Sequence, residues 1–172
     1  MRKVIVGVAI SLDGFIEGPK GEYDWCLTDD DYGLSNFFKR VDALFIGRKT
    51  YDMMQGQEAS PGMPRFTSYV FSNTLQKVKE GEVLVRGNIE EEVRRIKEAP
   101  GKDIWLFGGA SLASTLMNLK LVDEVWLSVH PILLGSGKPL FQDLKDRVHL
   151  KLLDSKTYPS GLVSLSYELD EK

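Results

Sequence analysis

The sequence has little cysteine, little histidine and no long hydrophobic run. Among its 172 residues are one cysteine, Cys26, and two histidines. A single cysteine excludes an intramolecular disulfide, and without a cluster of His and Cys the sequence predicts no metal site. No apolar stretch reaches the roughly 20 residues that a membrane-spanning helix needs, and residues 1–14 lack the cleavage site of a signal peptide. We therefore expect a cytoplasmic protein with no membrane partner.

The sequence also lacks an excess of positive charge. Its 22 Lys and Arg are outnumbered by 25 Asp and Glu, which gives a net charge of −3, and no basic run is present. Proteins that bind nucleic acid need a basic patch, so DNA and RNA are not expected partners. With 42% hydrophobic residues, a chain of this length predicts one domain over residues 1–172.

Short β-rich runs alternate with helical patterns along the chain. Strands are predicted at 3–10, 43–46, 69–72, 82–85, 104–107 and 124–130. Helical spacing is present in Leu34, Phe37, Phe38 and Val41 after residues 29–31, and again in Ile89, Val93 and Ile96 behind Asn88 as N-cap. This alternation predicts an α/β fold with a mainly parallel sheet.

Two segments depart from this alternation. Side chains of two kinds alternate over residues 162–169, and Pro159-Ser160-Gly161 joins them to residues 148–158, which predicts a C-terminal antiparallel hairpin at one sheet edge. Residues 55–65, rich in Gly, Pro and Ser, predict a loop near the ligand.

Three predicted strands end in groups that suit phosphate. Gly108-Gly109 follow one strand and open a helix whose first amides are free, although tight packing of a strand on a helix also needs small residues. A second strand runs into Gly47-Arg48-Lys49-Thr50, which adds two cations and a hydroxyl, and a third into Ser72-Asn73. Ligands of α/β sheets bind at such carboxyl ends, so we expect a dinucleotide with an extra 2′-phosphate as the ligand. The sequence lacks the G-x-G-x-x-G fingerprint of the usual dinucleotide-binding fold.

Four segments carry a resemblance to a known family: VAISLDGFI at 8–16, IGRKTY at 46–51, FGGASL at 107–112, and LVDEV through PILLGSGKPLF at 121–141. They resemble, in order, the C-terminal reductase domain of the bifunctional riboflavin-biosynthesis protein, within the dihydrofolate-reductase-like family. The resemblance implies a dihydrofolate-reductase-like three-layer sandwich, NADPH as cofactor and a homodimer. It also implies hydride transfer to a C=N bond or to a ribosylaminopyrimidine or pterin-like substrate, as in 5-amino-6-(5-phosphoribosylamino)uracil reductase.

The resemblance also assigns positions to the cofactor. Phosphates would meet Arg48 and Thr50 beside Gly47 and Lys49, the adenosine end would meet Ser72 and Asn73, and the diphosphate would meet Gly108, Gly109, Ala110, Ser111 and Leu112. The nicotinamide would meet Ala9, Ile10, Gly14 and Ile16.

The substrate side departs from the family pattern. Riboflavin reductases carry an Asp-Asp-Pro…Arg segment that residues 51–65 lack, and folate reductases place a carboxylate shortly after a tryptophan. Aligning on Trp25 puts Asp30 near that position, whereas aligning on Phe38-Lys39 puts Leu34 there. The candidate catalytic acids are Asp13, Asp30 and Asp31, and the candidate substrate wall is Trp25, Phe38 and Tyr51.

Two other functions fit parts of the sequence. A protein with this cofactor cradle can bind a dinucleotide without reducing anything, because fold does not guarantee chemistry. Residues 109–113 approximate a G-x-S-x-G nucleophile elbow, with Ser111 followed by Asp123 or Asp143 and then His149 in hydrolase order.

Overall fold

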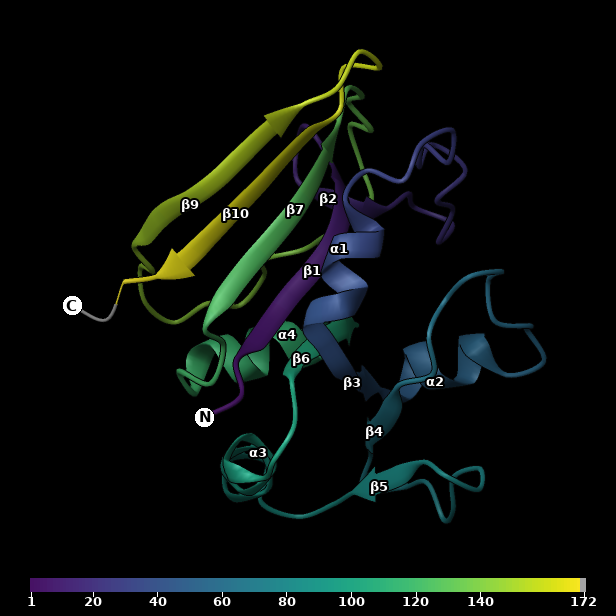
Figure 1. Cartoon of the computed structure of the whole chain (residues 1–172), viewed down its shortest axis with the longest axis vertical. Helices are drawn as coiled ribbons and strands as arrows, with labels where there is room; N and C mark the ends of the chain where they lie inside the picture. Colours follow the sequence, from purple (N-terminus) through teal and green to yellow (C-terminus); the bar gives the residue numbers. More distant parts are fainter. Residues whose placement is uncertain (171–172) are drawn as a thin grey trace.

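The computed structural model describes residues 1–170 and is built on one eight-stranded sheet (Figure 1). The strand order is β5-β4-β3-β6-β1-β7-β10-β9. All pairings from β5 to β7 are parallel, and β10 is antiparallel to both β7 and β9. This confirms the predicted parallel sheet and C-terminal hairpin. The strands are β1 (Val4–Ser11), β3 (Val41–Gly47), β4 (Thr67–Phe71), β5 (Val83–Val85), β6 (Asp103–Gly108), β7 (Glu124–His130), β9 (Leu150–Thr157) and β10 (Val163–Leu169).

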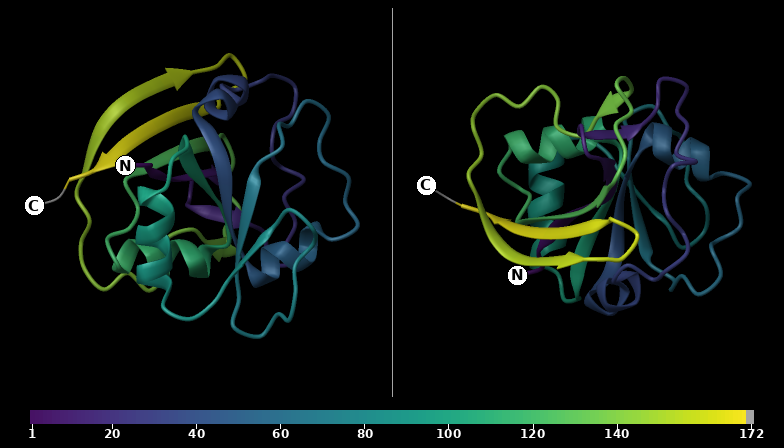
Figure 2. Two further views of the ribbon diagram at one scale, coloured as in Figure 1. Left: turned by 60° about the horizontal axis from the view of Figure 1, so that its bottom comes forward. Right: turned by 90° about the horizontal axis from the view of Figure 1, so that it is seen from above.

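Four helices cover the two faces of this sheet and give the predicted three layers. Helices α3 (Ile89–Glu98) and α4 (Ala110–Asn118) pack on one face, and α1 (Leu34–Arg40) and α2 (Arg48–Met54) pack on the other. Figure 1 shows α1 in front of the sheet and α4 behind it, and Figure 2 shows the same layers from below and above. Within residues 1–170, no helix is long and apolar enough to cross a bilayer.

The central strands are apolar on both faces because helices cover both. Val4, Ile5 and Val6 in β1 are at most 2% exposed, and their side chains enter the two opposite core layers. A parallel strand in this position reads as a continuous apolar run rather than an alternating one, which is why β1, β3 and β6 were recognisable in the sequence.

The helix boundaries differ from the expectation at two places. Val41 begins β3 instead of ending α1, because its extended backbone places a β-branched side chain in the buried sheet. The N-cap of α1 is Gly33, and Asp31 instead accepts a hydrogen bond from the Ser35 amide. Asn88 is confirmed as the N-cap of α3, since its side chain accepts from the amides of two following residues.

A second, two-stranded sheet was not foreseen. It pairs β2 (Phe15–Glu17) with β8 (Lys138–Pro139), two segments too short for any periodicity to show. Asp13 supports this sheet, since its carboxylate accepts hydrogen bonds from the backbone amides of Leu134 (3.1 Å) and Gly135 (2.8 Å). The segment that carries Lys138 is thereby fixed beside the end of β1.

Candidate functional site

A cavity of about 470 Å³ opens at the carboxyl ends of β3, β4, β5 and β6, on the edge where the sequence predicted a ligand. We call it the cationic cavity. Ten of the residues predicted to bind the cofactor line it: Gly47, Arg48, Lys49, Thr50, Ser72, Asn73, Gly109, Ala110, Ser111 and Leu112. The sheet therefore brings the three strand ends together.

Two helix starts at this cavity, those of α2 and α4, are open to an anion. Helix α4 begins at Ala110 with no side-chain cap and no acidic residue in its first turn, and α2 begins in the same way at Arg48. Helix α3, whose first residue Ile89 also lines the cavity, differs from them, since it has both an Asn88 cap and three glutamates in its first turn. The first amides of α4 thus keep their hydrogen-bonding capacity and the positive end of the helix dipole for a ligand.

Gly108 and Gly109 pack against a threonine of the neighbouring helix. Their peptide bond is cis. A Cβ atom added at Gly108 would lie 3.1 Å from Thr50 Oγ1, and one added at Gly109 would lie 3.3 Å from it. The absence of a side chain at Gly108 and Gly109 therefore allows Thr50 to pack against them. Both interpretations of the glycine pair apply, because the pair allows close packing and also precedes an uncapped helix start.

Positive charge gathers in this cavity. Its lining includes four cationic side chains, Arg48, Lys49, Arg86 and Lys138, and among the described residues that form the lining none is Asp or Glu. Arg48 is held from outside the lining, since its Nε atom lies 2.9 Å from Asp52 Oδ2. In a chain whose net charge is −3, such a group produces a local positive potential suited to phosphate.

Several lining residues were missed by sequence reasoning. Arg86 and Gly87 follow β5, so the rule applied to the other strand ends would have found them had it been applied to the predicted strand at 82–85. Lys138 reaches the cavity only through the unforeseen β2–β8 sheet. The other unpredicted lining residues are Phe71, Val85, Ile89, Thr115 and Gln142.

A second cavity, of about 130 Å³, lies on the sheet face that α1 covers. We call it the aromatic cavity. Gly7 and Ala9 of β1 pair with Trp126 and Ser128 of β7, so three small residues leave a hollow beside the indole rings of Trp105 and Trp126. The remaining lining residues are Val8, Cys26, Leu27, Tyr32, Leu34, His130 and Leu162.

Most polar side chains of the aromatic cavity already have protein partners. The indole Nε1 of Trp105 donates to the Gly7 carbonyl, and that of Trp126 donates to Ser164 Oγ, both at 2.8 Å. His130 Nε2 accepts from the Leu27 amide at 3.1 Å, so the hydrogen of the neutral ring lies on Nδ1 and is donated to the Ser128 carbonyl.

Two further groups of the aromatic cavity, the Tyr32 hydroxyl and the Cys26 thiol, have raised pKa values. The Tyr32 hydroxyl donates to Asp29 Oδ1 at 2.6 Å, which raises the pKa of Tyr32. Burial, with a smaller contribution from Asp24, raises the pKa of the Cys26 thiol.

The four residues predicted to contact the nicotinamide do not lie at one place in the structure. Ala9 lines the aromatic cavity, whereas Ile10 belongs to the core on the opposite face. Gly14 lies in the β1–β2 turn, where its carbonyl accepts from the Leu140 amide, and Ile16 lies in β2 and packs against the same core as Ile10.

The three predicted catalytic carboxylates are not brought into either cavity. Asp13 holds a loop, and hydrogen bonds from Ser11 Oγ and the two loop amides lower its pKa. Asp31 accepts from Ser35, which lowers its pKa, and Asp30 accepts from the Asp31 amide. Of the two positions that the alignments offered for an acid, Leu34 lines the aromatic cavity and Asp30 does not.

The three rings predicted as a substrate wall lie outside both cavities. Tyr51 is 6% exposed in the core, and its hydroxyl accepts a hydrogen bond from the Lys79 amide. Phe38 packs against Phe66 and Trp105, while Trp25 meets the His130 ring edge on and donates its indole N–H to the Glu22 carbonyl at 3.3 Å. Phe38 and Tyr51 pack in the core layer on the α1 and α2 face, whereas Trp25 lies beside His130, so the three rings do not share a cavity.

The structure separates the groups of the hydrolase alternative. Ser111 lies at the start of α4 and lines the cationic cavity. His149 lines a different cavity together with Met117 and Lys120 from the other end of that helix, about 10 Å further along at 1.5 Å per residue. No nucleophile and base pair is formed. Among residues 1–170 there is also no group of three His, Cys, Asp or Glu placed to hold a metal.

Comparison with known proteins agrees with this geometry. The family model of the RibD C-terminal domain matches residues 2–164. The chain is 44% identical to the uncharacterized protein YyaP of Bacillus subtilis, over 96% of this chain and 94% of YyaP. A Shewanella sp. PV-4 structure, described as a candidate riboflavin biosynthesis protein, is 27% identical with a TM-score of 0.86 over 98% of this chain and 99% of that one.

Dihydrofolate reductase from Enterococcus faecalis, solved with NADP(H), shares the fold at 18% identity, with a TM-score of 0.70 over 98% of this chain and 97% of that one. The dihydrofolate-reductase-like architecture expected from the sequence is therefore confirmed. The chain belongs to the RibD C-terminal domain family of riboflavin biosynthesis, with a reductase-like fold.

Proposed function

We propose that this protein is an NADPH-dependent reductase that transfers a hydride to a C=N bond of a planar, pyrimidine- or pterin-like heterocycle. The observation that carries the proposal is the cationic cavity, whose described lining has four cations and no carboxylate beside the uncapped start of α4. A dinucleotide with a diphosphate and a 2′-phosphate presents the complementary charge.

The residues present fit such a cofactor. Amides at the start of α4, with Ser111, would hold the diphosphate, and Arg48, Lys49, Arg86 and Lys138 are the cations available to the 2′-phosphate. When bound, NADPH supplies the hydride. Ala9 and the aromatic cavity would flank the reacting end, because β1 carries Ala9 on the face that is hollowed beside Trp126.

The proton needed at nitrogen would come from water. The described lining of the aromatic cavity contains no carboxyl group, and both nitrogens of His130 are occupied by Leu27 and Ser128. The roles of Asp13, Asp30 and Asp31 would then be structural, in loops and at a helix start.

Titration with NADPH and NADH tests the proposal. Removing a charge-assisted phosphate contact costs about 1.5–3 kcal/mol, so in Arg48→Ala or Arg86→Gln the NADPH Kd should rise by about 10- to 150-fold, while the NADH Kd changes little. Arg94→Gln, on the exposed side of α3, is the matched control. If the wild-type chain binds NADPH and NADH with equally high Kd values, the proposal is contradicted.

Turnover separates a reductase from a dinucleotide-binding protein. The candidate acceptors are pterins, ribosylaminopyrimidines and small cyclic imines, and the nicotinamide absorbance reports oxidation of NADPH. We expect oxidation with at least one of these acceptors. Stoichiometric binding with no oxidation across that set would favour the binding protein.

We also propose a homodimer formed through the β9 edge of the sheet. All eight residues of β9 are exposed, and Leu150, Leu152 and Leu153 are 41–52% exposed. An unpaired strand edge with apolar side chains is a common template for association. Sedimentation should give twice the mass of the chain, and Leu152→Glu should shift it toward the monomer. A monomeric wild-type protein at assay concentration would refute the proposal.

A further inference from the structure

The aromatic cavity differs from the cationic cavity in the charge of its lining. Among the described residues that line it there is no Lys, Arg, Asp or Glu. Its shape comes from flat rings and small residues: the Phe37 ring stacks on Trp126 with centroids 4.5 Å apart, and a Cβ at Gly7 would collide with Trp105. Such a surface recognises a ligand by shape and stacking.

The side chains that could hydrogen-bond a ligand are mostly committed to the protein. Both lining indoles donate to protein oxygens, His130 uses both ring nitrogens, and the Tyr32 hydroxyl contacts Asp29 and Ser160. A phosphate entering this cavity would lose its water without gaining charged donors, and that exchange is strongly unfavourable.

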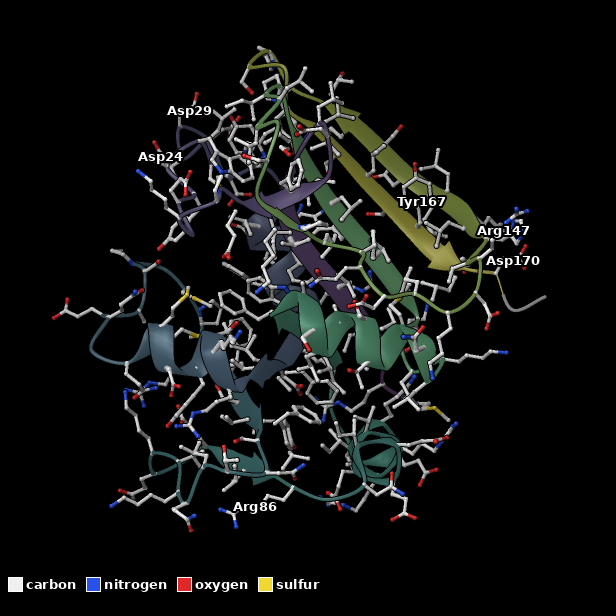
Figure 3. The ribbon with its side chains drawn as sticks, turned by 180° about the vertical axis from the view of Figure 1, so that it is seen from behind. Asp24, Asp29, Arg86, Arg147, Tyr167 and Asp170 are labelled. Carbon is white, nitrogen blue, oxygen red and sulfur yellow. The ribbon has the colours of Figure 1, made fainter. Side chains whose placement is uncertain are left out.

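The rim of the aromatic cavity is acidic. Asp24, Asp29, Asp30 and Asp31, all exposed, lie in the segment that supplies Cys26, Leu27 and Tyr32 to the lining. Asp29 touches the Tyr32 hydroxyl directly. One cation is also near these aspartates: the Lys156 ammonium lies over the Tyr158 ring, and its charge contributes to the lowered pKa of Asp31. Figure 3 shows Asp24 and Asp29 at the opposite end of the molecule from Arg86 of the cationic cavity.

We propose that the aromatic cavity binds a planar, one-ring group that is neutral or positively charged and carries no phosphate. This deepens the proposed function by naming the class of its acceptor, and rests on it for the assignment of that acceptor as a substrate. The cavity, of about 130 Å³, is open to solvent on one side, so it offers its rings and small residues to one flat ring rather than enclosing a larger ligand. The aspartates of the rim favour a cation over an anion of the same shape.

A set of isosteric probes tests the charge preference without turnover. Benzamide, benzamidinium and benzoate share one flat ring and differ in charge, and phenyl phosphate adds the excluded group. The chain has three tryptophans, so the indole N–H resonances of Trp105 and Trp126 report binding at the lining, and that of Trp25 reports the edge beside His130.

The expected result is that benzamidinium and benzamide shift the Trp105 and Trp126 resonances at lower concentration than benzoate, with phenyl phosphate weakest. Both binders should also slow alkylation of Cys26, the single cysteine, by iodoacetamide. Tighter binding of benzoate or phenyl phosphate at these resonances would overturn the proposal, as would no shift with any of the four compounds up to their solubility.

Two kinds of variant change the charge at the aromatic cavity itself and so test the charge preference directly. In Leu34→Asp, a carboxylate enters the lining at a 37% exposed helix start, and the benzamidinium-to-benzoate affinity ratio should rise by about fivefold. Neutralising the rim with Asp24→Asn and Asp30→Asn should lower that ratio. The paired changes Glu58→Gln and Asp146→Asn, which alter the net charge equally on other loops, should leave it unchanged. An unchanged ratio in both site variants would refute the proposal.

The cofactor titration is separate from this test. If NADPH fails to bind while the probes rank as expected, the proposed function fails and the charge preference of the aromatic cavity stands. If NADPH binds and the probes rank in reverse, the proposed function stands and this inference fails.

Discussion

The ion pair between Lys97 and Asp123 gives a sharp test of the packing at the amino ends of the strands. Lys97 Nζ lies 2.7 Å from Asp123 Oδ2, and the same oxygen accepts the Val4 amide at 2.7 Å. The Lys97 side chain is 8% exposed, whereas that of Asp123 is 33% exposed. The pair is therefore asymmetric: the lysine depends on its partner for compensation of charge, and the aspartate also reaches water.

This asymmetry sets the expected costs. Breaking a fully buried pair by removing one partner costs about 3–5 kcal/mol. Because water reaches Asp123, we expect about 2–3 kcal/mol for Asp123→Asn, which leaves the ammonium buried while the amide oxygen still accepts from Val4. Lys97→Met removes the buried charge together with its need for a partner and keeps the apolar stem, so about 1 kcal/mol or less is expected.

Urea unfolding of the two single variants and the double variant measures these values. The m-value should stay constant, and the double variant should cost less than the sum of the two single costs because the sites share one interaction. NADPH affinity serves as the control, since the pair lies at the opposite ends of the strands from the cationic cavity. If Lys97→Met costs as much as Asp123→Asn, the asymmetry derived from exposure is wrong.

Three further outcomes follow from single contacts. Asn88→Ala removes the α3 cap and should lower the free energy of unfolding by about 1 kcal/mol in the same urea assay, with Asn88→Ser largely restoring it. Tyr51→Phe should cost about 0.5–1.5 kcal/mol through its lost hydrogen bond and leave KM for any substrate unchanged; a raised KM would return Tyr51 to the substrate site. The pKa of Asp13 is lowered in the folded protein, so its contribution to stability is complete above the ordinary value of 3.8 and is lost as the pH falls through the folded value. Asp13→Asn should reproduce that loss at neutral pH as faster hydrogen exchange at the Leu134 and Gly135 amides, and unchanged exchange there would contradict the role of the carboxylate.

The cationic cavity was largely predictable because its signals are local. Each strand end carries its own glycine, cation or hydroxyl within a few residues, and a parallel sheet places all such ends on one edge. Arg48 and Gly109 could therefore be assigned to one site although 60 residues separate them in the chain.

The aromatic cavity was not predictable in this way. Its hollow depends on Gly7 and Ala9 lying beside Ser128, a pairing set by strand order rather than by any nearby pattern. His130 and Trp126 looked like ordinary strand residues for the same reason. Phe38, which did belong to a recognisable helical pattern, packs against the core on the α1 face.

Lys138 shows a third kind of limit, since it reaches the cationic cavity through a two-residue strand whose partner lies more than 100 residues earlier in the chain. No periodicity exists over two residues, and the hydrogen bonds that Asp13 accepts from the loop are long-range.

The separation of charge along the molecule has a kinetic consequence. Overall the chain repels an anion, since its net charge is −3, yet Arg48, Lys49, Arg86 and Lys138 attract one over the last stretch of its approach. Because salt screens such attraction beyond about 8 Å at physiological ionic strength, dilute buffer would accelerate cofactor capture while departure of the bound molecule changed less. A cationic acceptor would be attracted to the acidic rim of the aromatic cavity instead, so the two ligands could arrive from opposite directions without competing for the same path.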